Sequence, residues 1–136
     1  MKHIFLDTNI IIDLISNREP FGKSAIQIFQ GAESKKYKLY ASSHSIATTH
    51  YLLKKFVEEK KLRKILSELL NFINIISIDD VIIKKSLKSA HKDFEDAIQM
   101  NCAYSNPKIE CILTRNIKDF KLCEIDVYTS EEFLNL

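Results

Sequence analysis

Short apolar runs alternate with amphipathic stretches along the chain. The first run, residues 3–6, is unbroken and ends at Asp7, which is typical of a strand buried on both faces. From residue 8 to residue 15 the apolar residues recur at helical spacing, and Pro20 excludes a longer helix. A strand, an aspartate and a helix are therefore predicted at the beginning of the chain.

The same alternation continues through the rest of the sequence. Further strands are predicted at residues 38–41, 74–78, 110–114 and 125–128. Helices are predicted at residues 23–33, 44–57, 62–70, 81–90 and 93–102, and from Ser130 onward. Strands that alternate with helices predict an α/β domain with a mainly parallel sheet that is covered on both faces. We expect residues 1–136 to form a single domain.

Composition and charge narrow the classes of function. The chain has 136 residues, is 46% hydrophobic and has only 2 Gly and 2 Pro, which fits a globular domain and excludes a disordered chain. Its net charge of +2 argues against binding nucleic acid through bulk charge, so any such contact must be local.

No apolar run approaches the roughly 18–20 residues that cross a bilayer. We expect a cytoplasmic protein that does not contact the membrane. The three cysteines lack C-x-x-C spacing, so we expect buried free thiols.

Polar side chains follow the predicted strands. Asp7 comes directly after the first strand, and the segment 114–119 (Thr-Arg-Asn-Ile-Lys-Asp) follows the strand at 110–114. Glu95 and Asp96 lie in the first turn of a predicted helix. Each acid taken alone has a structural interpretation, because Asp7 is a favoured helix N-cap and acids suit the first turn of a helix.

Together these acids favour a metal site. In a parallel sheet, Asp7, Asp96 and the Asn116/Asp119 segment can meet at the carboxyl edge of the strands. Two charges about 4 Å apart repel by roughly 4 kcal/mol at an effective dielectric near 20, so such a cluster requires a raised pKa or a cation. Oxygen ligands suit Mg²⁺ or Mn²⁺, and a water on such an ion can attack a phosphodiester. The chemistry indicated is phosphodiester hydrolysis.

Three short motifs resemble the PIN-domain family, the ribonuclease fold of VapC-type toxins. They are Phe-Leu-Asp-Thr-Asn at 5–9, Phe-Glu-Asp-Ala at 94–97 and Leu-Thr-Arg-Asn at 113–116, the last followed by Lys-Asp-Phe at 118–120. The resemblance covers essentially the whole chain in the family's order. It implies a Rossmann-like three-layer α/β/α sandwich with four to five strands and an endoribonuclease that depends on Mg²⁺ or Mn²⁺. It also implies an RNA substrate, an antitoxin protein as partner and a homodimer.

The resemblance assigns roles to individual residues. Asp7 matches the family's first acid and Asp96 its acid near the start of the later helix, while Asn116 stands where the family usually has Asp. Asp119, close behind, is a candidate substitute or supporting acid. We therefore expect Asp7, Asp96 and Asn116 to bind the metal, with Asp119 added to the catalytic set. Expected substrate contacts are Asn9, Thr114 and Arg115.

The sequence departs from the family at Thr48, where a glutamate is common; a subgroup of the family also has a neutral polar residue there. With less negative charge, one metal ion should bind more weakly.

Nearby His50 is either a proton donor or an ordinary helix position. The basic run 54–64 is either a phosphate contact or a solvated helix face, and Glu58 and Glu59 within it favour the second interpretation.

Two rival functions remain open. Thr48 and Asn116 are consistent with a PIN-like module that no longer cleaves RNA and serves as an RNA-binding or protein-binding scaffold. A haloacid-dehalogenase-like phosphatase would use Asp7 as a nucleophile, but that chemistry requires a second Asp two residues later, where this chain has Asn9.

Overall fold

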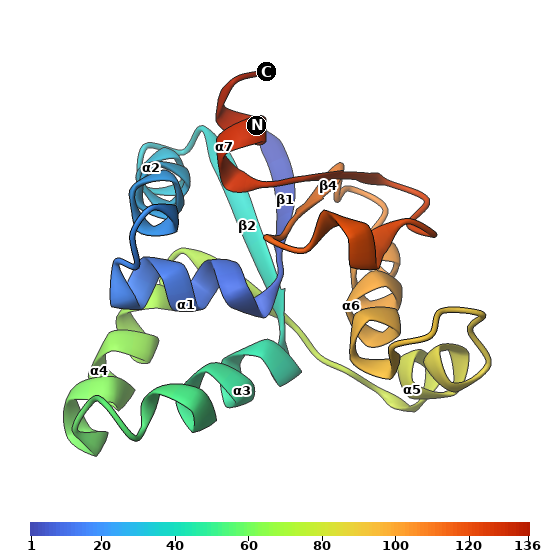
Figure 1. Ribbon diagram of the computed structural model, residues 1–136, viewed down its shortest axis with the longest axis horizontal. Coiled ribbons are helices and arrows are strands. Elements are labelled where there is room, and N and C mark those ends of the chain that lie inside the picture. The colour runs from blue at the N-terminus through green and yellow to red at the C-terminus, as the bar shows by residue number, and fades with distance from the viewer.

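A five-stranded sheet crosses the molecule in the computed structural model, which describes residues 1–136 (Figure 1). The strands are β1 (Lys2–Leu6), β2 (Tyr37–Ser42), β3 (Ile73–Ile76), β4 (Cys111–Leu113) and β5 (Asp126–Tyr128). All neighbours pair in parallel, in the order β3-β2-β1-β4-β5. The chain therefore builds outward from β1 to β3 and then returns to the other side of β1, where β4 pairs with it. The strand order reverses between β1 and β4.

Alternate residues of each strand enter two separate cores. Ile4 and Leu6 of β1 belong to one hydrophobic cluster, whereas Phe5 belongs to the other. In the next strands along the sheet, Tyr40 and Ile112 pair with Phe5 and lie on its side. Both faces of the sheet are buried, which explains why the strands read as unbroken apolar runs.

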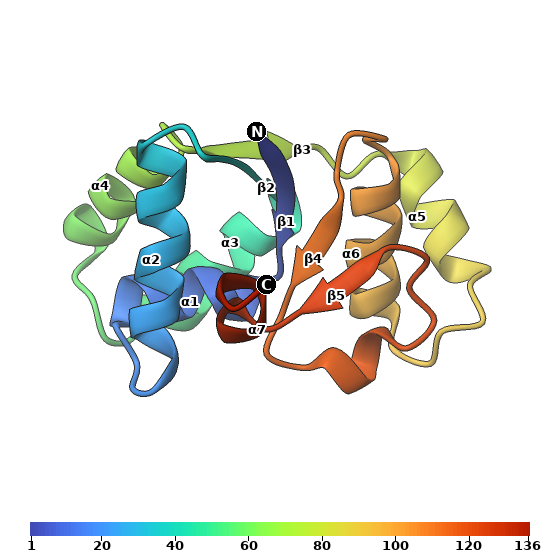
Figure 2. The same cartoon turned by 90° about the horizontal axis from the view of Figure 1, so that it is seen from above.

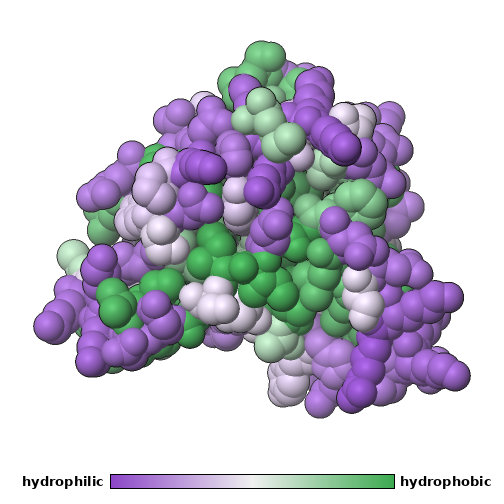
Figure 3. All heavy atoms as spheres, turned by 180° about the vertical axis from the view of Figure 1, so that it is seen from behind, coloured by the Kyte–Doolittle hydropathy of each residue, from purple (hydrophilic) through white to green (hydrophobic).

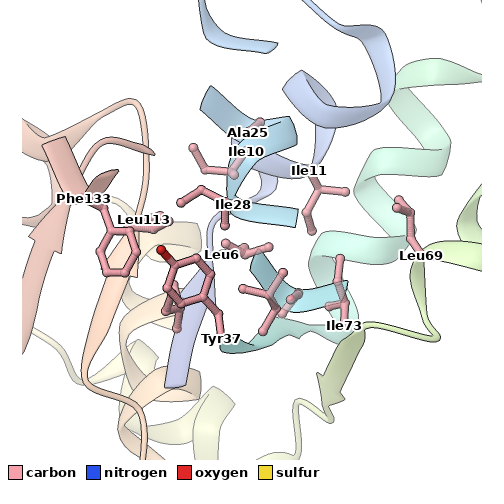
Figure 4. Packing of buried hydrophobic residues seen from close by; sticks show 14 of the residues in the cluster. Leu6, Ile10, Ile11, Ala25, Ile28, Tyr37, Leu69, Ile73, Leu113 and Phe133 are labelled. Atoms are coloured by element: carbon pink, nitrogen blue, oxygen red, sulfur yellow. The ribbon is translucent and has the colours of Figure 1, made fainter. Parts of the chain in front are cut away.

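Helices cover the two faces as the outer layers of a three-layer α/β/α sandwich (Figure 2). The face containing Ile4 and Leu6 packs against α1 (Thr8–Ser16), α2 (Phe21–Glu33), α3 (Ser43–Leu53), α4 (Glu59–Leu69) and α7 (Ser130–Leu134). The opposite face packs against α5 (Asp80–Leu87), α6 (Phe94–Tyr104) and the short 3₁₀ helix η1 (Ile117–Phe120). Figure 4 shows side chains of α1, α2 and α7 around Leu6 and Leu113, with Leu69 of α4 farther along the same cluster beyond Ile73.

Local capping explains where several helices begin. Asp7, Ser42, Asp79 and Asp93 each accept a hydrogen bond from a backbone N–H in the first turn that follows. The structural interpretation of Asp7 as an N-cap is thus correct, and it coexists with the position of this residue at a strand end.

The predicted α/β/α fold is confirmed, but the helix predicted at 44–57 is too long. It ends at Leu53, whose carbonyl accepts hydrogen bonds from the N–H groups of Phe56 and Val57 in a turn. The next helix begins at Glu59, three residues earlier than predicted, because the carboxylate of Glu58 caps it.

The cysteines are free, as predicted, and Cys102 and Cys111 are buried. Burial raises the pKa of the Cys111 thiol in β4 to about 12, so it stays protonated at neutral pH. None of the helices has both the length and the apolar character to cross a membrane.

Candidate active site at the carboxyl edge of the sheet

The candidate site lies where the strand order reverses, which is the usual ligand position in parallel α/β sheets. Asp7 follows β1 and its backbone N–H donates to the carbonyl of Leu113, the last residue of β4, over 2.9 Å. This bond brings the ends of β1 and β4 together. A cavity of about 830 Å³ lies here, and Asp7 and Asp96 are both in its wall.

Asp7 is only 8% exposed, and four donors hold its carboxylate. Its Oδ1 accepts from the backbone N–H of Thr8 at 2.8 Å and from Gln99 Nε2 at 3.0 Å. Its Oδ2 accepts from Thr114 Oγ1 at 2.8 Å and from Asn9 Nδ2 at 3.4 Å. Hydrogen bonds to both oxygens stabilise the buried charge and fix the orientation of the carboxylate.

Gln99 of α6 is a site residue that the sequence analysis missed. Its amide nitrogen donates to Asp7 and also to Ser45 Oγ at 2.8 Å, while its carbonyl oxygen accepts from Ser42 Oγ at 2.7 Å. The Asp7 carboxylate sets the orientation of the amide, because a carboxylate only accepts and a flipped amide would turn its oxygen toward it; the two serine hydroxyls can donate or accept. The signal available in the sequence was a polar residue three positions after Asp96, on the same helix face.

Asp96 lies one turn before Gln99 on α6 and has a different environment. Burial, followed by the negative charges of Asp93, Asp7 and Asp119 in that order, raises the pKa of its carboxyl group from 3.8 to about 6, against a smaller lowering by His91. The site therefore concentrates negative charge that a bound cation would relieve.

The donor set fits a divalent ion that keeps most of its waters. No group of three or more His, Cys, Asp or Glu side chains is close enough to hold a metal. Mg²⁺, however, is commonly held by only one or two carboxylates, and Asp7 and Asp96 supply two. Glu95 also lines the cavity, but its side chain is 72% exposed and lies 3.7 Å from His44.

The other predicted residues divide into those inside and those outside the cavity wall. Asn9 and Arg115 line the cavity, as does Thr48 at the position where the family commonly has glutamate. Thr114 is fully buried beneath Asp7. Asn116 is not in the wall; it begins η1, and its backbone N–H donates to Thr114 Oγ1 at 3.1 Å.

Asp119 and His50 also lie outside the wall. The backbone carbonyl of Asp119 contacts the His91 ring, and the charge of its carboxylate reaches Asp96. His50 is bonded through Nε2 to Glu59 of α4 at 2.7 Å, which supports its interpretation as an ordinary helix position.

Comparison with known proteins agrees with this geometry. The sequence profile of the PIN domain matches residues 3–118. The chain belongs to the PIN-domain family. Ribonuclease VapC1 of Aquifex aeolicus (strain VF5) is 30% identical to this PIN domain over 138 residues, which cover 97% of this chain and 93% of the relative.

Solved structures share the fold of this PIN domain. A toxin–antitoxin complex from Klebsiella pneumoniae contains a chain 31% identical with a TM-score of 0.70, and the match covers 93% of this chain and 97% of the other. VapBC-1 from nontypeable Haemophilus influenzae matches with a TM-score of 0.70 at 19% identity, over 95% of this chain and 98% of the other. The low identity of the second match makes it evidence for the fold alone.

Proposed function

We propose that this PIN domain is a metal-dependent endoribonuclease and the toxin of a toxin–antitoxin pair. The observation that carries the proposal is the pairing of Asp7 and Asp96 at the carboxyl edge of the sheet, where burial and then the repulsion by neighbouring acids raise the pKa of Asp96 to about 6. The relative named as a ribonuclease, at 30% identity over nearly the whole chain, supports the same activity.

In this proposal Asp7 and Asp96 hold a Mg²⁺ or Mn²⁺ ion, and Asp119 adds negative charge from outside the cavity wall. When bound, the ion would polarise the phosphodiester and lower the pKa of the attacking water. Gln99 and Thr114 keep the Asp7 carboxylate aimed at the cavity through their hydrogen bonds. The guanidinium of Arg115 would bind the RNA phosphate from the wall of the same cavity.

The test is cleavage of a mixed pool of structured and single-stranded RNA, with Mn²⁺ and with a chelator. Asp7→Asn and Asp96→Asn should each lower cleavage at least about 100-fold, because each removes a metal-binding charge. Asp80→Asn is the matched control, since this aspartate pairs with Lys84 on the exposed surface of α5. Cleavage that persists in Asp7→Asn or in chelator would contradict the proposal.

A non-cleaving scaffold is the second candidate, because no third acid completes the pair and Thr48 and Asn116 are neutral. Calorimetric titration with Mn²⁺ separates the two functions. A nuclease should show heat of binding that Asp7→Asn abolishes, whereas a scaffold should show none that depends on Asp7 or Asp96.

We extend the proposal to partners. One wall of the cavity is apolar and includes Ile12, Ile15, Leu52 and Phe56, the last of which is 82% exposed. An antitoxin segment docked there would cover the acids, and the Klebsiella pneumoniae chain was solved in a toxin–antitoxin complex.

A homodimer would in turn cover exposed apolar residues of the middle helices, such as Tyr51 at the end of α3. Apolar side chains also gather on the face opposite that of Figure 1, as Figure 3 shows; the edge strand β3 leaves Ile75 44% exposed.

A further inference from the structure

A buried ion pair joins Arg115 to Asp13, an acid that the chemistry described so far does not use. Asp13, on the inner face of α1, is 1% exposed, and its Oδ2 lies 3.0 Å from Nε of Arg115. Neither oxygen of Asp13 accepts a hydrogen bond, so charge and proximity rather than an aligned hydrogen bond hold the pair together. A buried acid without other donors is unfavourable for folding, which suggests a role other than stability.

Three contacts restrain Arg115 at both ends of the residue. Asn9 Oδ1 accepts a hydrogen bond from its backbone N–H at 3.2 Å. Asp13, one helical turn after Asn9 on α1, pairs with the Nε atom. The guanidinium carbon also lies over the ring of Phe21, at the start of α2, 4.7 Å from the ring centroid.

These restraints leave part of the Arg115 side chain accessible. The Arg115 side chain is 25% exposed and belongs to the wall of the 830 Å³ cavity that contains Asp7 and Asp96. It also lines a second cavity, of about 130 Å³, together with Asp13 and Phe21. Because Asp13 pairs with Nε, the two terminal nitrogens remain for a ligand, and they form the edge that binds phosphate in a bidentate manner.

We propose that Asp13 is a positioning residue that holds Arg115 through Nε and aims its terminal nitrogens at an RNA phosphate in the main cavity. The inference rests on the proposed function for the identity of the phosphate. A side chain ordered before binding loses less conformational freedom when the RNA arrives, so binding is tighter than with a mobile arginine.

A double-mutant cycle tests this coupling. Binding of a fluorescein-labelled 12-nucleotide single-stranded RNA of mixed sequence is measured in chelator, so that no cleavage occurs. Asp13→Asn keeps the shape of the side chain and should weaken binding about two- to tenfold. The same change made on an Arg115→Gln background should weaken binding no further, because the residue through which Asp13 acts is gone.

Binding that is unchanged or tighter in Asp13→Asn would overturn the proposal, since the carboxylate would then compete with phosphate. Equal losses on both backgrounds would also overturn it, because Asp13 would then act on packing rather than through Arg115. Asp80→Asn serves as the matched control and should bind RNA like the wild type.

Nuclear magnetic resonance of the arginine Nε–H groups gives a readout that needs no RNA. The chain has three arginines, so the Arg115 signal is identified by its loss in Arg115→Lys. This signal should exchange slowly with water in the wild type and faster in Asp13→Asn. An Arg115 signal that does not depend on Asp13 would overturn the inference even if the protein cleaves RNA. A third outcome is that Asp13 protects this signal but the wild-type protein does not bind RNA. That outcome would overturn the proposed function, and with it the phosphate role of Arg115.

Discussion

Two aspartates at the same sheet edge have opposite environments. Asp7 receives four hydrogen bonds, which satisfy its charge within the protein. Asp96 is partly buried among other carboxylates, and its pKa rises to about 6. Asp7 is therefore held in one orientation, whereas the negative charge of Asp96 is repelled by the carboxylates around it. A site that keeps such repulsion makes the protein less stable but favours the binding of a cation.

Replacing Asp96 should accordingly stabilise the protein when no metal is bound. Because the pKa of Asp96 is higher in the folded protein than its usual 3.8, the folded state binds the proton more tightly. The contribution of Asp96 to the free energy of unfolding therefore falls as pH rises from about 4 to about 6. Asp96→Asn removes this loss, so we expect it to be more stable by the order of 1 kcal/mol at pH 7 to 8.

Thermal unfolding in chelator at several pH values checks this expectation. The difference between Asp96→Asn and the wild type should shrink as the pH falls and be lost only well below 3.8, where Asp96 is protonated in both the folded and the unfolded state. A variant that is less stable than the wild type at pH 8 would show that the negative charge of Asp96 is not repelled.

One glycine in α2 allows this helix to pack closely against β2. A Cβ atom at Gly31 would overlap the Tyr37 ring at the start of β2. That ring is buried and packs edge-on against Phe133 of α7, with ring centroids 5.3 Å apart, so it has little room to move. Gly31 lets the helix approach the sheet, although glycine is a poor helix former.

Gly31→Ala should lower the free energy of unfolding. Overpacking costs about 1–3 kcal/mol, while the gain in helix propensity is about 1 kcal/mol, so we expect a net loss of roughly 1 kcal/mol. Urea unfolding measures it. The neighbouring Gln30 is exposed, and Gln30→Ala should change stability by less than about 0.5 kcal/mol. A Gly31→Ala protein as stable as the wild type would mean that Tyr37 moves aside.

At the scale of the whole molecule, the candidate site exists only when the sheet is assembled. Asp7 follows β1, Thr114 follows β4, and Asp96 and Gln99 come from α6 on the other side of the sheet. An unfolded chain has no such grouping, so a cation that binds this site must stabilise the folded state.

Mn²⁺ should therefore raise the melting temperature. At 100 times its Kd, the ion adds about 2.7 kcal/mol, which corresponds to roughly 5–10 °C for a chain of this size. The shift should reverse with chelator and be absent in Asp7→Asn, while Asp80→Asn keeps it. An equal shift in Asp7→Asn would place the ion elsewhere.

The sequence by itself determined the alternation of strands and helices, because burial on both faces requires unbroken apolar strands. It also identified Asp7 and Asp96 as a potential acid pair and Asn9, Thr114 and Arg115 as neighbours at the same edge. The structure brings these residues to one edge of the sheet because the carboxyl ends of parallel strands must share an edge. The exact ends of the helices escaped prediction, because the Glu58 side chain decided where α4 begins.

Only the tertiary structure decided which side chains hold the acids and the arginine. Gln99 donates to a carboxylate 92 residues away in the sequence, and Asp13 reaches Arg115 across the layers of the fold. It also placed Asn116 and Asp119 outside the cavity wall. The physical reason is that a hydrogen bond or ion pair depends on the positions of the two side chains to within a few tenths of an ångström. Long-range packing sets these positions, and the local sequence pattern does not.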